Sequence, residues 1–274
     1  MLRNELATLS AYLELREKLG VVEVEGRRYY VAEGDLLLDE DQLSLYAAER
    51  EKLARDRAAS ELIDGSMPLI GFEQWLSAAA EGGRIVRWAE GMKLTYTIDR
   101  ATFHTSAEAE LATRYMREAT VAWEATCGID FEEVGVEQNG SNGSEEPPLF
   151  IVRKFDSGGK FIAAAFFPNE PTFRRRILLD PYLFDPSLRF DPVGVVRHEL
   201  GHVLGFRHEH IRGGAPADCP NENPGIDLTE YDPQSVMHYF CGGVGSRELQ
   251  ITEIDKRGAQ LVYGQPHRRV RFFK

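Results

Sequence analysis

This chain of 274 residues has little of three things that mark other classes of protein. It has three cysteines, an odd set, so at least one of them has no partner within the chain. It has no apolar run long enough to cross a bilayer, which predicts no membrane span. Positive charge is in deficit, with 32 basic against 44 acidic residues, and the formal charge of -12 disfavours nucleic acid and anionic membranes as partners.

The composition that remains suits a large core, because 43% of the residues are hydrophobic. Residues 1–64 hold 15 acidic and 9 basic residues, which is half of the net charge and typical of a separable segment. Residues 1–6 are amphipathic and soon acidic, without the apolar core of a secretory signal. Three histories therefore stay open: a cytoplasmic protein, export by a non-classical route, or a chain trimmed at its start.

The hydrophobic pattern predicts two parts. In the first, residues 2–19 and 41–64 are predicted to be helices, and residues 21–31 a hairpin around Gly26. A segment rich in Gly, Ser and Ala over residues 65–83 suits a linker.

In the second part, strands are predicted at 92–98, 129–134, 149–152, 162–167 and 177–179. One helix is predicted at 105–127 and is expected to stop at Gly128. A second is predicted to start after Asp191-Pro192, and a third at 252–263. This order indicates a mixed sheet with two long helices, a poorly regular segment after Gly205, and a cleft between the halves.

The most informative stretch runs from His198 to His208. On a helix, His198 and His202 leave the same face about one turn apart, so both can reach one metal ion. Gly205 can reverse the chain and bring His208 to a third position. Three protein ligands with one open corner suit a catalytic zinc, whereas structural zinc sites usually have four.

This extended pattern resembles the metzincin clan of zinc peptidases, whose second mark is a methionine turn such as residues 235–239. Glu209 after the third histidine, and Tyr239 two residues after Met237, resemble the astacin family. The resemblance covers about residues 85–265. It implies an α+β zincin fold, with a mixed five-stranded sheet, an active-site helix and an irregular C-terminal subdomain. It also implies two domains, a mostly helical propeptide over residues 1–84 and an astacin-like catalytic domain over residues 85–274.

The same resemblance assigns roles in a zinc-dependent endopeptidase. It implies one zinc ion bound by His198, His202 and His208, with Met237 beneath it. Glu199 is implied as the general base that activates the zinc-bound water for attack on a peptide bond. Tyr239 is implied as a fifth ligand at rest, which then donates a hydrogen bond to the developing oxyanion.

A second motif lies in the first part, where residues 32–36 resemble the aspartate motif of astacin propeptides. Asp35 is thereby implied as a zinc ligand that keeps a precursor latent, until another protease or the chain itself cleaves between about residues 60 and 87. The alternative is that Gly34-Asp35 is only a turn. The resemblance also implies secretion, whereas residues 1–6 do not have the apolar core of a secretory signal.

Several alternatives remain at this stage. One is an inactive metal-binding module of the same fold, and another is a zinc hydrolase of a non-peptide amide. Residues 163–168 resemble the substrate-side strand of matrixins more than that of astacins. Cys219 and Cys241 flank the methionine turn and are able to pair in an oxidising compartment, whereas Cys127 lacks the C-terminal partner of its astacin counterpart. His210 and His238 are interpreted as structural or solvent-facing, and the basic side chains at 153–154 and 174–176 as solvated charges or as attractors of an acidic substrate.

Overall fold

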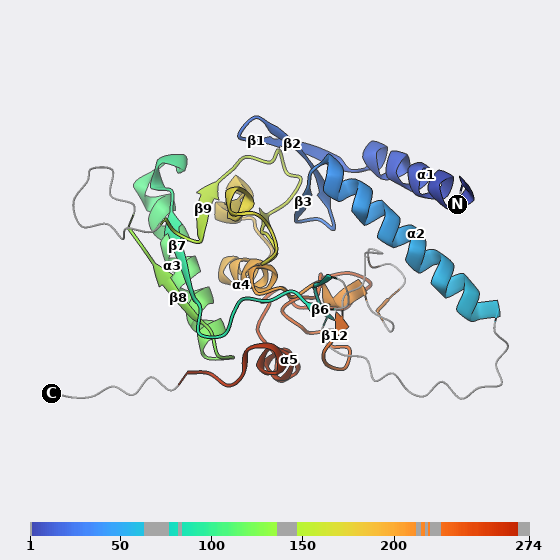
Figure 1. The fold of residues 1–274 in the computed structure, drawn as a ribbon. Coiled ribbons are helices and arrows are strands. Elements are labelled where there is room, and N and C mark those ends of the chain that lie inside the picture. Colours follow the sequence, from blue (N-terminus) through green and yellow to red (C-terminus); the bar gives the residue numbers. More distant parts are fainter. Residues whose placement is uncertain are drawn as a thin grey trace. The chain divides into compact units, whose positions relative to one another are not determined.

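The N-terminal unit of the computed structural model is built from two helices and a three-stranded sheet (Figure 1). The structure describes residues 2–62, 77–81, 84–135, 147–211, 215–216, 219 and 226–267, which form two compact units. The N-terminal elements are α1 (Leu2–Lys18), β1 (Gly20–Val24), β2 (Arg27–Ala32), β3 (Leu36–Leu38) and α2 (Glu40–Leu62). Both predicted helices and the hairpin are confirmed.

Two turns shape the N-terminal sheet, whose strands lie in the order β1-β2-β3 and are antiparallel. The first turn places Glu25 and Gly26 at positive φ, 53° and 74°, as a two-residue hairpin loop requires. The second places Glu33 and Gly34 at φ 53° and 89°, and its Asp35 N–H donates to Ala32 O at 3.2 Å. Asp35 is therefore held on a tight turn between β2 and β3.

The second unit contains a five-stranded mixed sheet in the order β10-β11-β9-β7-β8. β7 runs parallel to β8 and β9, and β9 runs parallel to β11, whereas β10 is antiparallel to β11 at the edge. The bounds are β7 (Lys93–Ile98), β8 (Asp130–Glu133), β9 (Phe150–Lys154), β10 (Ala163–Ala164) and β11 (Arg176–Leu179). The expected α+β fold with a mixed five-stranded sheet is confirmed.

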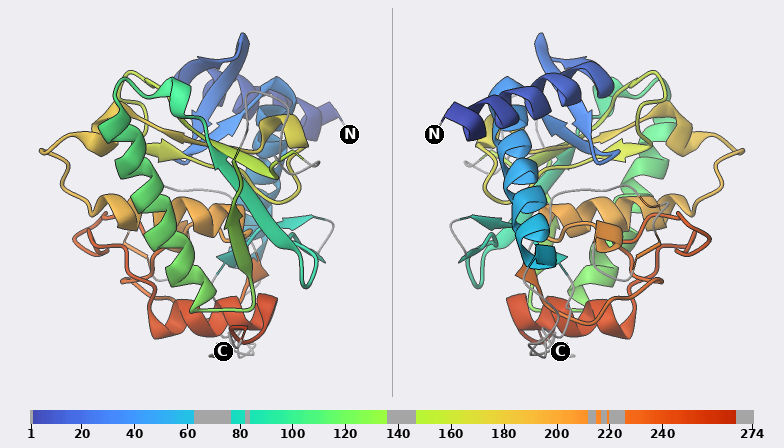
Figure 2. Two further views of the ribbon diagram at one scale, coloured as in Figure 1. Left: turned by 90° about the vertical axis from the view of Figure 1, so that its left-hand side faces the viewer. Right: turned by 90° about the vertical axis from the view of Figure 1, so that its right-hand side faces the viewer.

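Three helices accompany this sheet: α3 (Ser106–Glu124), α4 (Pro192–Val203) and α5 (Glu253–Tyr263) (Figure 2). Short 3-10 helices lie at Arg100–Thr102, Thr172–Arg174, Pro181–Phe184 and Glu209–Ile211. Two small ribbons pair β4 (Ser77–Ala78) with β12 (Ile226–Asp227), and β5 (Ala80–Glu81) with β6 (Arg84–Ile85). No helix in the described part of the chain has both the length and the apolarity needed to cross a membrane.

The core of this unit lies between the sheet and helices α3 and α4. Fully buried side chains from the three layers share it: Leu94, Phe150, Val152, Ile177, Met116, Trp123, Val196 and Leu200. Trp123 of α3 donates from Nε1 to Arg197 O of α4 at 2.9 Å, which satisfies the indole within an apolar interface. α4 is consequently fixed from one side by a buried aromatic anchor.

Two elements differ from the sequence prediction by more than two residues at one end. The strand predicted at 162–167 is reduced to Ala163–Ala164, because only these residues pair with β11. The helix predicted to stop at Gly128 ends at Glu124, with Ala125 as its C-cap. Gly128 serves close packing instead, since a Cβ there would lie 2.4 Å from Tyr263 O.

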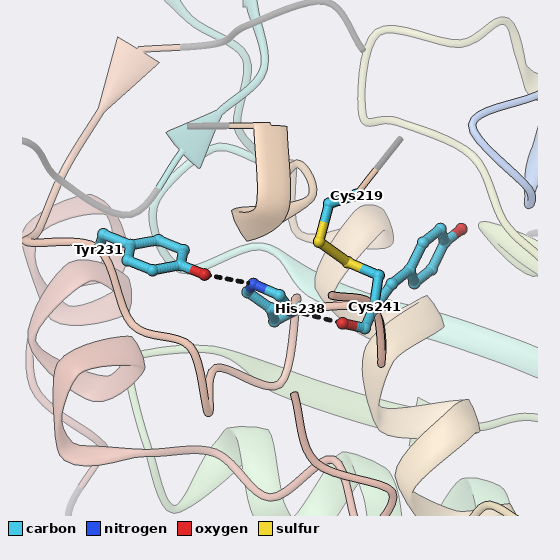
Figure 3. Close-up of a disulfide and its surroundings, with 5 residues drawn as sticks. Cys219, Tyr231, His238 and Cys241 are labelled. Atoms are coloured by element: carbon cyan, nitrogen blue, oxygen red, sulfur yellow. Dashed lines mark hydrogen bonds between the residues drawn. A yellow bond between two sulfur atoms is a disulfide. The ribbon is translucent and has the colours of Figure 1, made fainter. Parts of the chain in front are cut away.

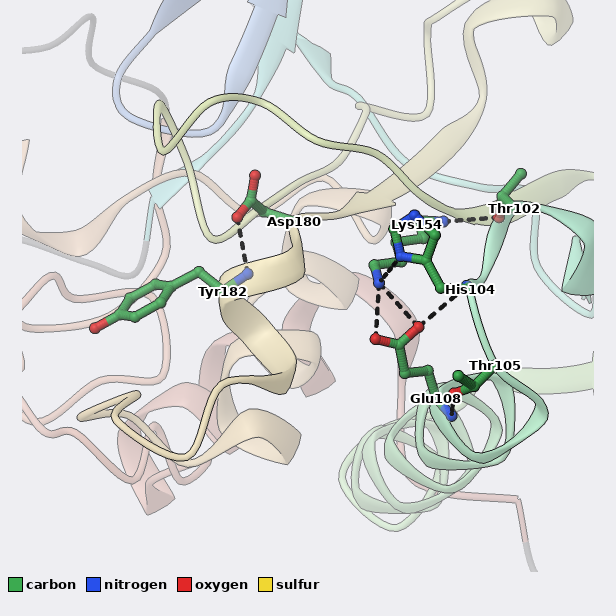
Figure 4. A network of polar contacts seen from close by, with 7 residues as sticks. All are labelled: Thr102, His104, Thr105, Glu108, Lys154, Asp180 and Tyr182. Atoms are coloured by element: carbon green, nitrogen blue, oxygen red, sulfur yellow. Dashed lines mark hydrogen bonds and ion pairs between the residues drawn. The ribbon is translucent and has the colours of Figure 1, made fainter.

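A partly buried ion pair joins the end of β9 to the start of α3 (Figure 4). Lys154 Nζ lies 2.8 Å from both carboxylate oxygens of Glu108 and 2.9 Å from His104 Nδ1. The Lys154 ammonium holds the pKa of Glu108 below its usual value. Arg153 likewise pairs with Asp99 at 2.8 Å. Both basic side chains are therefore engaged in ion pairs. Lys154 is buried, whereas Arg153 remains partly exposed.

Candidate metal centre

Helix α4 carries the first two histidines through the middle of the second unit. Asp191 caps it by accepting from Val193 N at 3.3 Å and Gly194 N at 3.1 Å, and Pro192 occupies its first turn, where no intrahelical N–H is needed. Every residue of the helix from Val193 to Val203 is buried. The predicted start of this helix is confirmed, and its burial removes the imidazoles from water.

The chain reverses directly after α4 through Gly205. This glycine has φ 91°, and a Cβ there would stand 2.3 Å from the backbone oxygen of Val86. Phe206 N donates back to Gly201 O at 2.9 Å, which closes the helix end. Only glycine fits this position without strain, and the reversal brings His208 back toward the helix.

The three histidines converge through their Nε2 atoms. His208 Nε2 lies 3.2 Å from His202 Nε2 and 3.2 Å from His198 Nε2. All three are buried, with 0% exposure at His202 and His208. His198 Nδ1 lies 2.7 Å from Val236 O, and His202 Nδ1 lies 2.8 Å from Phe206 O. Because a carbonyl only accepts, both Nδ1 atoms carry the proton and both Nε2 atoms present a lone pair.

This arrangement fits a zinc ion. Tetrahedral zinc with Zn–N bonds of about 2.0–2.1 Å requires ligand nitrogens about 3.3 Å apart. The 3.2 Å separations match that requirement, whereas neutral imidazoles have no other reason to aim lone pairs at one another in a dry interior. The backbone carbonyls of Val236 and Phe206 supply the partners that orient zinc-bound imidazoles.

Two further predicted site residues lie in the same unit. Glu199 follows His198 on α4 and is 2% exposed. Tyr239 is half-buried, with its ring centroid 4.3 Å from that of His208 and 5.7 Å from that of His198. A carboxylate beside the first ligand and a phenol against two ligand rings are thus brought to one place.

Met237 packs beneath this group against α4. It is fully buried, and a Cβ on Gly201 would lie 2.3 Å from its sulfur. Gly201 therefore leaves the space that the methionine fills. The close approach is a feature that the sequence pattern alone did not reveal.

The segment after His208 is tied to the methionine turn. Glu209 N donates to Met237 O at 2.9 Å, and Glu209 Oε1 accepts from Asp232 N at 2.9 Å. Glu209 is fully buried and links the third ligand to the turn. Through these two hydrogen bonds, Glu209 connects the segment after His208 to Met237 and Asp232.

His238 and His210 are buried, not solvent-facing. His238 receives the Tyr231 hydroxyl at Nε2, 2.7 Å away, and contacts Tyr239 O through Nδ1 at 2.5 Å (Figure 3). Burial lowers its pKa, so the neutral ring is favoured. His210 stacks on Tyr239 with centroids 4.7 Å apart. Their structural interpretation holds, and the solvent-facing alternative is wrong.

The cysteine pair left open by the sequence is a disulfide between Cys219 and Cys241, which encloses the methionine turn (Figure 3). Cys127 is a free, buried thiol. Asp35 belongs to the N-terminal unit, and its part in the site is taken up below as a proposal. Most of the predicted linker over residues 65–83 and of the predicted cleavage region between residues 60 and 87 lies outside the described residues.

A buried histidine triad on a glycine-terminated helix, backed by a methionine turn, defines a zinc metallopeptidase domain of the metzincin clan. The family model described as "Matrixin" matches residues 87–215. Together with the fold and the site, this match places the chain in that clan, and the predicted catalytic zinc is the ion that its histidine triad holds.

Relatives come from two metzincin families. Matrix metalloproteinase-16 of Rattus norvegicus and of Mus musculus is 26% identical over 167 residues, which are 56% of this chain and 24% of the relative. An astacin-like metalloendopeptidase of Gallus gallus is 40% identical over 62 residues, 17% of this chain and 15% of the relative. The chain thus spans about a quarter of the length of the matrix metalloproteinases it matches.

Solved structures of similar fold include myroilysin, with a TM-score of 0.46, 16% identity, and coverage of 76% of this chain and 96% of that chain. Another is high choriolytic enzyme 1, a hatching enzyme zinc-protease from Oryzias latipes, with a TM-score of 0.42, 18% identity, and coverage of 66% and 95%.

Proposed function

We propose that this chain is a zinc-dependent endopeptidase. The observation that carries the proposal is the convergence of three buried Nε2 atoms. His198 and His202 lie on the helix that also bears Glu199, and His208 Nε2 lies 3.2 Å from the Nε2 atom of each. A bound zinc would supply Lewis acidity and lower the pKa of a water molecule to about 7. The other parts of the reaction belong to side chains of this chain.

Glu199 is proposed as the general base. Its carboxylate takes the proton from the attacking water and later delivers that proton to the departing amine. Burial strengthens its interactions with charge that develops during the reaction, because water is excluded from the site. Tyr239 is proposed to be able to bind the metal before substrate arrives. Its hydroxyl would then donate a hydrogen bond to the carbonyl oxygen of the scissile bond.

The edge of the sheet suggests how a peptide is held. β10 is the terminal strand, paired on one side with β11, and its Ala163 and Ala164 side chains are small. An extended peptide is proposed to add beside β10 through backbone hydrogen bonds, as peptides often do at open sheet edges. This mode favours a peptide over a small non-peptide amide, which has too few backbone groups to pair.

Casein digestion by the full chain tests the activity. New amino termini are expected with the parent and not with Glu199→Ala at the same zinc content. Cleavage of a small amide but not of casein would establish the non-peptide hydrolase instead. Bound zinc without either activity, even after the chain has been cut between residues 60 and 87, would establish the inactive metal-binding module.

The N-terminal unit is proposed to act as a propeptide, with Asp35 as the ligand that fills the open coordination position. In support, the turn at Glu33 and Gly34 presents the aspartate, and Asp35 is 4% exposed. A buried carboxylate needs a compensating charge or donor set, which a zinc ion provides. Cleavage between residues 1–84 and 85–274 would then release the site.

The latency proposal is tested by the time course of peptide hydrolysis. Asp35→Ala is expected to shorten the lag before activity appears. Glu23→Ala, an exposed change on β1 of the same unit, is the control and is expected to leave the lag unchanged. If the Asp35 variant matures no faster and is no more active than the parent, the aspartate has no such role.

A further inference from the structure

Asp255, near the start of α5, is a buried carboxylate that the proposed reaction does not use. It is fully buried and accepts three hydrogen bonds. These come from Ser235 Oγ at 2.5 Å, Val236 N at 2.9 Å and Thr252 N at 3.0 Å. Burial outweighs these bonds and raises the pKa of Asp255 to about 6. Burying the Asp255 carboxylate costs stability, and the residues that donate hydrogen bonds to it indicate what it contributes in return.

One side of this carboxylate holds the turn that orients the first zinc ligand. Val236 donates its N–H to Asp255 Oδ2 at 2.9 Å and accepts from His198 Nδ1 with its carbonyl at 2.7 Å. The Asp255 carboxylate therefore binds the N–H of Val236, and the His198 imidazole binds the C=O of the same residue. Fixing the amide of Val236 restricts where its carbonyl points, and with it the plane of His198.

The other oxygen fixes the same turn through Ser235. Ser235 Oγ donates to Asp255 Oδ1 and accepts from Met237 N at 3.0 Å. Asp255 therefore anchors Ser235 and Val236 directly, and Met237 through one intermediate. Of these, Val236 contacts the first ligand and Met237 packs against Gly201 of the ligand helix.

A parallel chain of contacts leads from α5 to the third ligand. Thr252 Oγ1 donates to Asp232 Oδ2 at 2.6 Å, and Asp232 N donates to Glu209 Oε1 at 2.9 Å. Glu209 is the neighbour of His208 in the chain. The start of α5, where Thr252 and Asp255 form a capping box, is thus tied to both the first and the third histidine.

We propose that Asp255 is a positioning residue of the zinc site, which sets the orientation of His198 through the Val236 peptide. The inference rests on the proposed zinc-dependent function and deepens it. Replacing Asp255 by Ala leaves Val236 N and Ser235 Oγ without their acceptor, so the turn relaxes and the His198 ring loses its fixed direction. Asn at this position keeps an oxygen where both backbone amides need one.

The chain contains a matched control in Asp180. Its carboxylate is also buried, at 3% exposure, and accepts three hydrogen bonds. The donors are Ser157 N at 2.8 Å, Ser157 Oγ at 2.7 Å and Tyr182 N at 2.9 Å. Figure 4 shows the contact with Tyr182. Asp180 organises a loop and a 3-10 helix, whereas Asp255 organises the methionine turn. The pair separates loss of a buried carboxylate from loss of ligand orientation.

The test measures the zinc dissociation constant of the full chain by competition with a chromophoric chelator. The ligand-field spectrum of the cobalt-substituted protein is recorded beside it. Asp255→Ala is expected to bind zinc about 10-fold more weakly, at the lower end of the range for partners that orient metal ligands. Its cobalt spectrum is expected to shift. Asp180→Ala and Asp255→Asn are expected to stay within about 3-fold of the parent.

Equal zinc affinity in Asp255→Ala, Asp180→Ala and the parent overturns the inference while leaving the zinc site intact. A parent that binds no zinc overturns the proposed function as well. If Asp255→Ala does not fold, Ser235→Ala and Ser157→Ala take its place, since each removes one serine hydroxyl from one of the two carboxylates. Weaker zinc binding only in Ser235→Ala supports the proposal, and no difference between the two overturns it.

Discussion

The contact between Gly201 and Met237 allows a quantitative test of the site's packing. A methyl group on residue 201 would lie 2.3 Å from the Met237 sulfur, well inside van der Waals contact. Overpacking of this kind costs about 1–3 kcal/mol, and the higher helix propensity of alanine offsets about 1 kcal/mol. Gly201→Ala is therefore expected to lower the free energy of unfolding by roughly 0–2 kcal/mol.

Met237→Ala removes the side chain that the new methyl group would strike. Alone it is expected to cost about 2–5 kcal/mol, because the methionine is fully buried. In the double variant, the methyl group of residue 201 enters the vacated space. The decreases in unfolding free energy of the two single variants are therefore expected to add up to more than the decrease in the double variant, by at least about 1 kcal/mol.

Urea unfolding at a fixed free zinc concentration measures all four free energies of this cycle. Gly135→Ala is the control, because a Cβ at that position meets nothing within 4 Å. Its effect is expected to add to that of Met237→Ala. If Gly201→Ala and Met237→Ala also add to within about 0.3 kcal/mol, the packing described here is refuted.

Three further predictions concern charge and crosslinking. Because burial raises the pKa of Asp255 from 3.8 to about 6, the folded chain holds a proton there that the unfolded chain has lost. In denaturant titrations, the stability of the parent relative to Asp255→Asn is therefore expected to be greatest below pH 4. It is expected to fall by about 3 kcal/mol as the pH rises to 7, and a difference that does not change with pH would contradict this. Cys219→Ser, which opens a loop of sequence separation 22, is expected to cost about 3 kcal/mol in urea unfolding, and equal midpoints would refute the crosslink. Lys154→Met leaves the half-buried Glu108 without its cation and is expected to cost about 2 kcal/mol by the same measurement. The double variant Lys154→Met/Glu108→Gln is expected to cost less, and equal costs would contradict the pairing.

Much of the local structure could be predicted from the sequence because its determinants are local. Asp191 accepts backbone N–H groups at the start of α4, as its position before Pro192 indicated. The spacing of His198 and His202 needs only one helical turn to bring them together. Gly205 signalled the reversal because its backbone conformation is costly for other residues.

Features that depend on distant pairing were not predictable. The length of β10 is set by its pairing with β11, not by its own apolar pattern. The carbonyl of Val236 orients His198 across 38 positions in the sequence, and backbone groups carry no side-chain signature. Asp255 was visible only as part of a helix start, because its contact with the methionine turn forms only when α5 docks. Cys219 and Cys241 were identified as a candidate pair, but their 5.1 Å Cα separation is a property of the fold.

The most direct test of the central claim is the rate of peptide-bond cleavage as a function of zinc bound per chain. It is measured on the mature parent and on Glu199→Gln after metal removal and stepwise zinc addition. The account predicts that parental activity rises in proportion to zinc until one ion is bound, while the variant binds the same ion and cleaves at least about 100-fold more slowly. Full activity without zinc, or equal activity in the variant, would contradict it.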